Sequence, residues 1–491
     1  MKRTFSLVLS LPIILLSSCI DFILSLNYLS RHSRSTRPIP CLQFRWPNGQ
    51  GTDKFFNGSS ASRRWRHQLG PIYRIWSGMK PEIEQTLTIR RPSVLTEPHQ
   101  IKQYYRHSHK HIKSVDNNAG WLFHEILGSC VGVVSLGQWV NLRKAVDQPF
   151  TRTAAATYTG DFILQVRQYI DNLGDSSRLV FDPVGDMKDC AFLVVAQLFF
   201  GSLCPSQRHA LLQLGVLRED LFKHTFKGGL NRFSWLRYFP GSAQGQLATF
   251  QRRWELFVLE AYQQAAKKPH PQAPIVELWE KVQDGEITKP ECLQTLDESL
   301  FANLDVTALT TAWALIFLAH NQIIQDALRD EIRKVRADEM EYQQYINSDD
   351  TLLASCILES ARIRPILSFS NPESATEDHV IDGYTIPHNV DVIIDTHAIN
   401  VENSFWGPNA STYDPYRFKD IKHNDLRYNL WRFGSGPRQC LGKHVADRLL
   451  RTIAAEMVSL FEMRLDDLSV VSSQDDSWIG LPDTKITLKK Q

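Results

Sequence analysis

The chain has 491 residues, of which 43% are hydrophobic and 22% are charged, and its formal net charge is +2. This composition is ordinary for a globular protein with a large core, and the nearly neutral charge argues against a nucleic-acid-binding protein. The eight cysteines are scattered and form no Cys-x-x-Cys pair, which favours a reducing compartment over a disulfide-stabilised fold.

The first 30 residues form an apolar segment that starts with basic residues and is interrupted by Pro12 and Asp21. Such a segment is either a cleaved secretory signal or a membrane anchor, which needs about 20 apolar residues to span a bilayer. Three arginines follow within residues 31–37. Because basic residues stay on the cytoplasmic side of a membrane, we interpret residues 1–30 as a transmembrane anchor with the rest of the chain in the cytosol.

A basic, proline-containing linker is predicted over residues 31–65, and one large folded domain over residues 66–491. Near the start of this domain, residues 70–76 and 86–89 alternate between apolar and polar side chains, which predicts strands of a small sheet. Residues 144–334 have a mostly helical pattern. The sequence therefore predicts a mainly α-helical fold with a small β-sheet domain.

Trp139 and Arg143 stand just before this helical region, four residues apart. On a helix, the two side chains would project from one face. The pair alone is a weak signal, because packing in the core explains it equally well.

The longest helix is predicted over residues 292–335, which contain no glycine or proline. Apolar residues recur there at helical spacing, so we expect one long buried helix. Its polar residues include Asn303, Asp305 and Thr307. Polar side chains in a buried helix are often satisfied by the helix backbone or by water, and from the pattern alone a structural role for these three is the simpler interpretation.

Two further patterns follow this helix. Glu359 and Arg362 lie three residues apart in a helical segment, so they can pair on one face. Residues 383–394 indicate a turn that leads into a strand.

The most informative segment is residues 433–442, in which Cys440 stands among glycines and shortly after an arginine. A lone cysteine is more often a buried structural residue than a ligand. Here, however, the thiolate of Cys440 can bind a haem iron, glycines let the backbone approach a flat macrocycle, and Arg438 suits an anionic propionate. The segment therefore predicts a haem site.

This segment matches every fixed position of the signature Phe-x-x-Gly-x-Arg-x-Cys-x-Gly, so the chain resembles the cytochrome P450 family of haem-thiolate monooxygenases. The segments around Trp139, Asn303, Glu359 and residue 383 resemble further motifs of the family in the same order. The resemblance extends over essentially everything after the linker. It implies the P450 fold, a helix-rich domain with a small β-sheet domain, preceded here by the anchor.

The resemblance also implies roles for individual residues. Cys440 would be the axial ligand of heme b, and Arg143 and Arg438 would reach its propionates. The remaining residues of the cofactor site would be Trp139, Phe433, Gly436 and Gly442. Glu359, Arg362 and Arg417 would form a buried ion-pair triad that holds the haem-side core in one arrangement.

The long helix departs from the family pattern where it would cross the distal face of the haem. Asp305 keeps the usual acid, but Asn303 replaces a glycine and Val306 replaces a threonine. Thr307 carries a hydroxyl one residue later, which is about 100° away around a helix. The implied catalytic residues are therefore Asn303, Asp305 and Thr307, with Thr307 unable simply to replace the missing hydroxyl.

The implied reaction is oxidation of a hydrophobic small molecule by O2, with electrons from NADPH. An NADPH-cytochrome reductase would deliver them near basic residues such as Lys144 and Lys443, at the cytosolic face of the endoplasmic reticulum membrane. The distal segment is similar to that of fungal enzymes of secondary metabolism, some of which act on amino-acid-derived diketopiperazines. Two alternatives are an electron-independent haem-thiolate isomerase or dehydratase, and a non-catalytic haem-binding protein.

Overall fold

The structure of this protein, a computed structural model, describes Ser18 and residues 38–45, 48–77, 92–114, 117, 119–173, 180–238, 241–268, 273–474 and 477–491. The predicted anchor at residues 1–30 and the predicted strand at 86–89 therefore lie outside the described residues, apart from Ser18.

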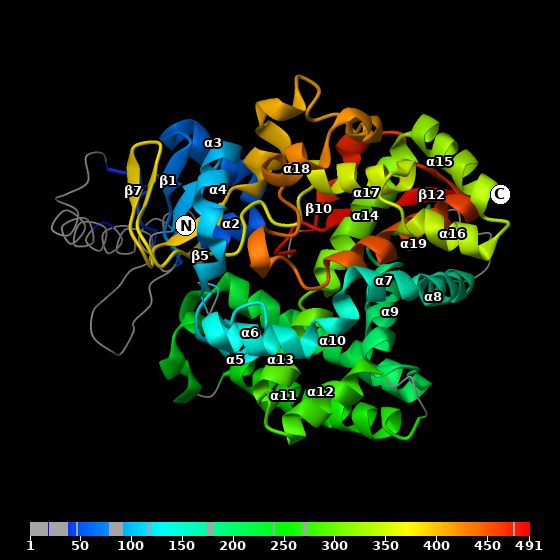
Figure 1. The fold of residues 1–491 in the computed structure, drawn as a ribbon, viewed down its shortest axis with the longest axis horizontal. Coiled ribbons are helices and arrows are strands. Elements are labelled where there is room, and N and C mark those ends of the chain that lie inside the picture. Colours follow the sequence, from blue (N-terminus) through cyan, green and yellow to red (C-terminus); the bar gives the residue numbers. More distant parts are fainter. Residues whose placement is uncertain are drawn as a thin grey trace, which may run out of the picture.

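Helices make up most of the described chain (Figure 1). They are α2 (Gly51–Phe56), α3 (Gly58–Leu69), α4 (Pro98–Tyr104), α5 (Trp121–Leu127), α6 (Leu136–Val146), α7 (Arg152–Thr157), α8 (Thr159–Asp171), α9 (Lys188–Phe200), α10 (Pro205–Lys227), α11 (Ser242–Ala265), α12 (Pro274–Gln283), α13 (Lys289–Leu300), α14 (Leu304–His320), α15 (Gln322–Val335), α16 (Glu339–Asn347), α17 (Leu352–Ile363), α18 (His423–Asn429) and α19 (Lys443–Leu460).

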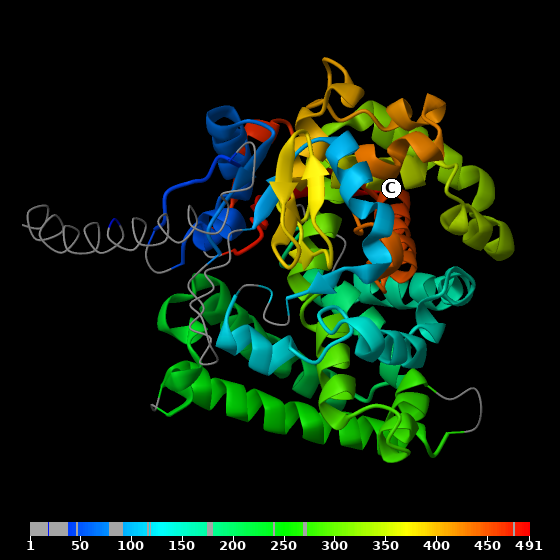
Figure 2. The ribbon, with the colours of Figure 1, turned by 60° about the vertical axis from the view of Figure 1, so that its left-hand side comes forward.

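The strands are short and form small sheets. They are β1 (Ile72–Arg74), β2 (Ser93–Leu95), β3 (Ile112–Lys113), β4 (Val180–Phe181), β5 (Glu373–Ser374), β6 (His379–Ile381), β7 (Tyr384–Ile386), β8 (Asp391–Ile394), β9 (Phe461–Arg464), β10 (Ser472–Ser473), β11 (Pro482–Asp483) and β12 (Ile486–Lys490). The largest sheet has the order β1-β2-β8-β5-β3, in which β2 and β8 are parallel. The hairpin of β6 and β7 lies beside α4 (Figure 2).

Helix α14 lies in the middle of the fold and packs against α9, α17 and α19 (Figure 1). Its sequence is apolar on all sides, and most of its side chains are buried, as expected for a helix enclosed by others. The mainly α-helical fold with small sheets is therefore confirmed. The strand predicted within residues 383–394 is also confirmed, as β7 and β8.

The predicted linker at residues 31–65 is wrong in its second half. Helices α2 and α3 occupy residues 51–69, and Ala61 and Trp65 are buried. These side chains pack with Tyr73 and Ile393 in a small apolar cluster. The glycine and prolines before residue 51 suggested a linker. The helix α3 that follows nevertheless buries an amphipathic face on the sheet.

The prediction of one unbroken helix over residues 292–335 is also wrong. The chain leaves the helical path at residues 301–303, between α13 and α14, and again at Asn321. At the first break, the amide nitrogen of Asn303 donates to the backbone carbonyls of Glu298 and Ser299, at 2.8 and 3.4 Å. A side chain thus satisfies carbonyls that the helix would otherwise bond, which is the competition that makes asparagine a poor residue inside a helix.

One stretch of the described residues, Lys289–His320, is long and apolar enough to cross a membrane, with a mean hydropathy of 1.5. It consists of α13 and α14, and 78% of the most apolar window is buried inside the fold. This burial is what the core helix of a folded domain shows.

Candidate active site

The cysteine loop, which we define as residues 433–442, makes a tight turn immediately before α19. Gly436 has a φ angle of 72°, a left-handed conformation that residues with a side chain rarely adopt. A Cβ atom at Gly436 would also lie 2.3 Å from the hydroxyl oxygen of Ser108. The backbone N–H of Cys440 donates to the carbonyl of Phe433 at 2.9 Å, so the loop is closed on itself.

The surroundings of Cys440 act on its thiol in opposite directions, with a net rise of its pKa. Burial raises its pKa, whereas the backbone N–H of Gly442 and the charges of Arg143 and Lys113 oppose that rise. The residue also lies just before the N-terminus of α19, where the helix dipole stabilises negative charge. The side chain of Cys440 keeps exposed surface, so its sulfur is accessible to a ligand.

Arg438 connects the cysteine loop to the segment before α6. Its Nη2 donates to the carbonyl of Val134 at 2.7 Å, and its Nη1 lies 3.4 Å from the hydroxyl of Ser135. The guanidinium also lies over the ring of Trp139, 4.9 Å from the ring centroid. Burial lowers the pKa of Arg438 to about 10. The structure thus brings together two residues that were predicted separately for the cofactor site, Arg438 and Trp139. The hydrogen bonds of Arg438 go to uncharged groups.

Arg143 contacts the cysteine loop from α6. Its Nη1 donates to the carbonyl of Gln439 at 3.2 Å, and its Nε donates to Asp147 at 3.0 Å. The structure therefore places both predicted propionate-binding arginines in direct contact with the loop or its flanking segment.

A third group of polar residues near this loop was missed in the sequence. Lys113 in β3 stands directly opposite Glu373 in β5, with 3.3 Å between the amine and the carboxylate. His111 also contacts this carboxylate, at 3.3 Å. The Nε2 atom of His111 is buried and has no hydrogen-bond partner among the described residues, so this edge of the site has a free polar atom.

On the distal side, Asp305 has both carboxylate oxygens occupied. One accepts from the amine of Lys188 in α9 at 2.8 Å, and the other accepts from the indole N–H of Trp478 at 2.8 Å. Lys188 also pairs with Glu219 of α10 at 2.7 Å. The ring of Trp478 stacks on Phe226 of α10, with 4.4 Å between the ring centroids. The acid therefore lies in a network that joins α9, α10, α14 and the C-terminal segment.

The other two predicted distal residues bond to the helix backbone. Asn303 donates to carbonyls of α13, as described above, and the hydroxyl of Thr307 donates to the carbonyl of Asn303 at 2.8 Å. Val306 contributes no polar side-chain atom, and its carbonyl accepts from Thr310 at 2.9 Å. For Asn303 and Thr307, the structural interpretation raised by the sequence pattern matches these contacts.

Glu359, Arg362 and Arg417 are brought together at the buried end of α17. The carboxylate of Glu359 accepts from the Nε of Arg362 at 2.7 Å and from the Nε of Arg417 at 2.8 Å. A third donor is the backbone N–H of Asp414, at 3.1 Å. Glu359 and Arg362 have no exposed side-chain surface. The remaining guanidinium nitrogens bond to nearby carbonyls, including that of Asn400 at 2.8 Å.

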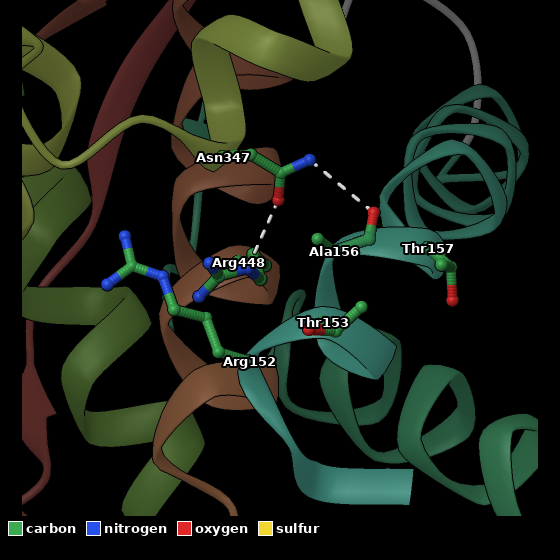
Figure 3. A pocket seen from close by; sticks show the side chains of 6 residues that line it. All are labelled: Arg152, Thr153, Ala156, Thr157, Asn347 and Arg448. Atoms are coloured by element: carbon green, nitrogen blue, oxygen red, sulfur yellow. Dashed lines mark hydrogen bonds between the residues drawn. The ribbon is translucent and has the colours of Figure 1, made fainter.

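A separate hollow of about 500 Å³ lies beside α19, lined by Arg152, Thr153, Ala156, Thr157, Asn347 and Arg448 (Figure 3). Asn347 bridges its walls, because it accepts from Arg448 at 3.1 Å and donates to the carbonyl of Ala156 at 3.4 Å. Neither a cysteine nor an acid lines this hollow, so its chemistry differs from that of the cysteine loop.

The family model described as Cytochrome P450 matches residues 51–489. The chain is a cytochrome P450. It is 46% identical over 497 residues to the cytochrome P450 monooxygenase gliC of Aspergillus fumigatus, over 98% of this chain and 95% of that protein. It is 48% identical over 458 residues to the cytochrome P450 monooxygenase verC of Clonostachys rogersoniana, over 92% and 88% of the two chains.

The fold also matches a solved structure. A zebrafish cytochrome P450 determined with progesterone superposes with a TM-score of 0.67 over 88% of this chain and 99% of that chain, at 18% identity. At this identity the match supports the fold alone. Together with the relatives, it establishes that this P450 is a monooxygenase of the family fold.

The residues around the cysteine loop of this P450 fit the haem that the family carries. Cys440 offers a thiol near a helix N-terminus. Among the residues that the structure describes, the guanidinium of Arg438 bonds to uncharged groups and the Nε2 atom of His111 has no hydrogen-bond partner. Cys440 would hold the iron, and Arg438 and Arg143 would hold the anionic propionates. When bound, the haem supplies the iron at which dioxygen is activated.

Proposed function

We propose that this P450 uses NADPH-derived electrons and O2 to oxidise a hydrophobic small molecule of fungal secondary metabolism, of the amino-acid-derived diketopiperazine class. The observation that carries the proposal is the combination of a thiol at the N-terminus of α19 with a buried, ion-paired acid, Asp305, on the distal helix. The thiolate is the ligand suited to activating dioxygen. The acid with its partners can hold and move a proton during dioxygen reduction.

The test is turnover by the purified holoenzyme with a reductase partner. Oxidised product should form from a cyclic dipeptide only when both NADPH and O2 are supplied. Product formed without NADPH would favour an isomerase or dehydratase, and binding without any product would favour a non-catalytic haem protein.

Electrons are proposed to arrive at the basic surface beside the cysteine loop, from an NADPH-cytochrome reductase. Lys144 is exposed at the end of α6. Lys443 at the start of α19 donates to Gln439 of the cysteine loop at 2.7 Å. Positive charge here would steer an acidic partner toward Cys440.

Residues 1–30 are proposed to anchor the enzyme in the endoplasmic reticulum membrane with its catalytic domain in the cytosol. On intact microsomes, we expect added protease to degrade the catalytic domain without detergent, because an anchor of this orientation leaves the domain outside the vesicle. A luminal domain would be protected until detergent is added. Mature protein in the culture medium would instead identify the segment as a cleaved signal.

Asp305→Ala is expected to lower product formation by about 100-fold, because a positioned acid or base contributes at least that much to proton transfer. Asp305→Asn keeps an acceptor for Trp478 but loses the charge that faces Lys188, so it separates the acid from the hydrogen bond. The measurement is product formed per NADPH consumed. Full coupling in both variants would remove Asp305 from proton delivery.

Two neighbouring positions complete this series. Thr307→Ala is expected to be milder than Asp305→Ala, because the hydroxyl of Thr307 bonds to a helix carbonyl. Val306→Thr is expected to be tolerated or to change the fraction of electrons lost to peroxide. Thr310→Ala is the matched control, since its hydroxyl makes the same type of bond one turn later. A collapse of coupling confined to Thr307→Ala would show that Thr307, rather than Asp305, serves the reaction.

A further inference from the structure

Three carboxylates flank the break between α13 and α14, and two of them have a cationic partner. Asp297 bonds to the Nε of buried Arg218 at 2.9 Å, and Asp305 pairs with Lys188 at 2.8 Å. The third, Glu298, has no Lys, Arg or His within ion-pair distance in the part of the chain that the structure describes. The charge of Lys113 lowers the pKa of Glu298. Lys113 is itself paired with Glu373.

Glu298 lies on the side of α13 that faces the segment between α5 and α6. One of its oxygens accepts from the backbone N–H of Gly132 at 3.0 Å. Two residues later, the carbonyl of Val134 accepts from Arg438, which stands two residues before Cys440. The negative charge of Glu298 also acts on the pKa of both Arg438 and Cys440. A short chain of contacts therefore connects this carboxylate to the iron-binding loop.

The backbone makes room for Glu298 at Gly132. A Cβ atom at that position would lie 1.7 Å from one carboxylate oxygen, which no side chain can tolerate. The φ angle of Gly132 is not in the left-handed region. The backbone conformation therefore does not require glycine here, whereas the close approach of the Glu298 carboxylate does. The glycine is therefore required for the position that the carboxylate takes.

The protein satisfies Glu298 only in part. A carboxylate can accept about four hydrogen bonds, and the donors present are the N–H of Gly132 and the thiol of Cys130. Burial raises the pKa of Glu298, as expected for a charge taken from water without a counter-ion. Its side chain nevertheless keeps some exposed surface. The remaining lone pairs are thus open to a donor on a bound molecule.

Asn303, at the break between α13 and α14, offers a second acceptor. Its amide nitrogen is used by the carbonyls of Glu298 and Ser299, which leaves its amide oxygen as the group that can accept. A substrate that lies along this stretch would meet the oxygens of Glu298 and of Asn303.

We infer that Glu298 is a specificity-determining residue, which accepts a hydrogen bond from an N–H group of the substrate. The inference rests on the proposed function and adds to it the group that is recognised, an amide nitrogen of a cyclic dipeptide. A buried carboxylate gains most from a donor that replaces the water it has lost. A ligand with its amide nitrogens methylated cannot donate, and it loses this interaction.

The test compares the binding of cyclo(Phe-Phe) and of its N,N′-dimethyl derivative to the holoenzyme. Binding is measured from the change in the Soret spectrum. We expect the unmethylated compound to bind about tenfold or more tightly than the methylated one to the wild-type enzyme. Glu298→Gln, which replaces one acceptor oxygen by a donor, should remove most of this preference. Ser299→Ala is the control, because the hydroxyl of Ser299 is satisfied by the carbonyl of Thr295.

A second variant covers the case in which Glu298→Gln fails to retain haem. Gly132→Ala retains the Glu298 side chain but forces its carboxylate to move. It should therefore reduce the same preference. Equal binding of both compounds to wild type, no binding of the unmethylated compound, or an unchanged preference in both variants would overturn the inference. Turnover with NADPH is measured separately. If the enzyme is active but does not prefer the unmethylated compound, the inference on Glu298 is wrong and the monooxygenase proposal stands. If the preference is present but no product forms, only the monooxygenase proposal is contradicted.

Discussion

Cys440→Ala should abolish the red-shifted Soret band that the reduced enzyme forms with carbon monoxide. The thiolate is the group that causes this shift, and Cys440 is the cysteine on the loop that closes before α19. We expect complete loss of the band together with loss of product formation. The measurement is the difference spectrum of the reduced protein with and without carbon monoxide.

Cys204→Ala is the matched control for this experiment. Cys204 is also a free and exposed cysteine, but it lies at the start of α10. Its replacement should leave the band unchanged. A Cys440→Ala protein that binds haem and still shows the shifted band would contradict the assignment of the ligand.

Glu359→Ala should destabilise the fold by about 3–5 kcal/mol, because it leaves two guanidinium groups without their carboxylate in a buried site. Arg362 keeps bonds to backbone carbonyls, but these groups carry no compensating charge. We expect the variant to be recovered with little haem or largely insoluble. The measurements are haem content per polypeptide and the free energy of unfolding.

The exposed pair of Asp330 and Arg333 provides the control for Glu359. It has the same three-residue spacing, but its side chains are 68% and 66% exposed. Exposed pairs contribute at most about 1 kcal/mol, so Asp330→Ala should leave haem content unchanged. Normal folding and haem retention in Glu359→Ala would refute a structural role for the triad.

The sequence was most informative where the relevant contacts are local. The cysteine loop spans ten consecutive residues of one motif, and Glu359 and Arg362 lie within one helical turn, so the residues that meet are close in the chain. Arg417 contacts Glu359 across 58 residues, and the family resemblance rather than any spacing indicated it.

Contacts between distant segments left no local pattern to find. Lys113 meets Glu373 only because β3 and β5 pair in a sheet, and Lys188 reaches Asp305 because α9 packs on α14. The break at residues 301–303 was missed for a related reason. Absence of glycine and proline indicates a continuous helix, but the side chain of Asn303 can replace the backbone donors that continuity requires.

The indole of Trp478 makes the acid of this P450 thermodynamically linked to α10. The same ring donates to Asp305 and stacks on Phe226, so a displacement of α10 acts on the hydrogen bond that holds the carboxylate. By reciprocity, a ligand that stabilises one position of α10 also changes the strength of the hydrogen bond between Trp478 and Asp305, and a change in that bond changes the affinity for that ligand. The position of α10 and the anchoring of the Asp305 carboxylate are therefore coupled through one aromatic ring.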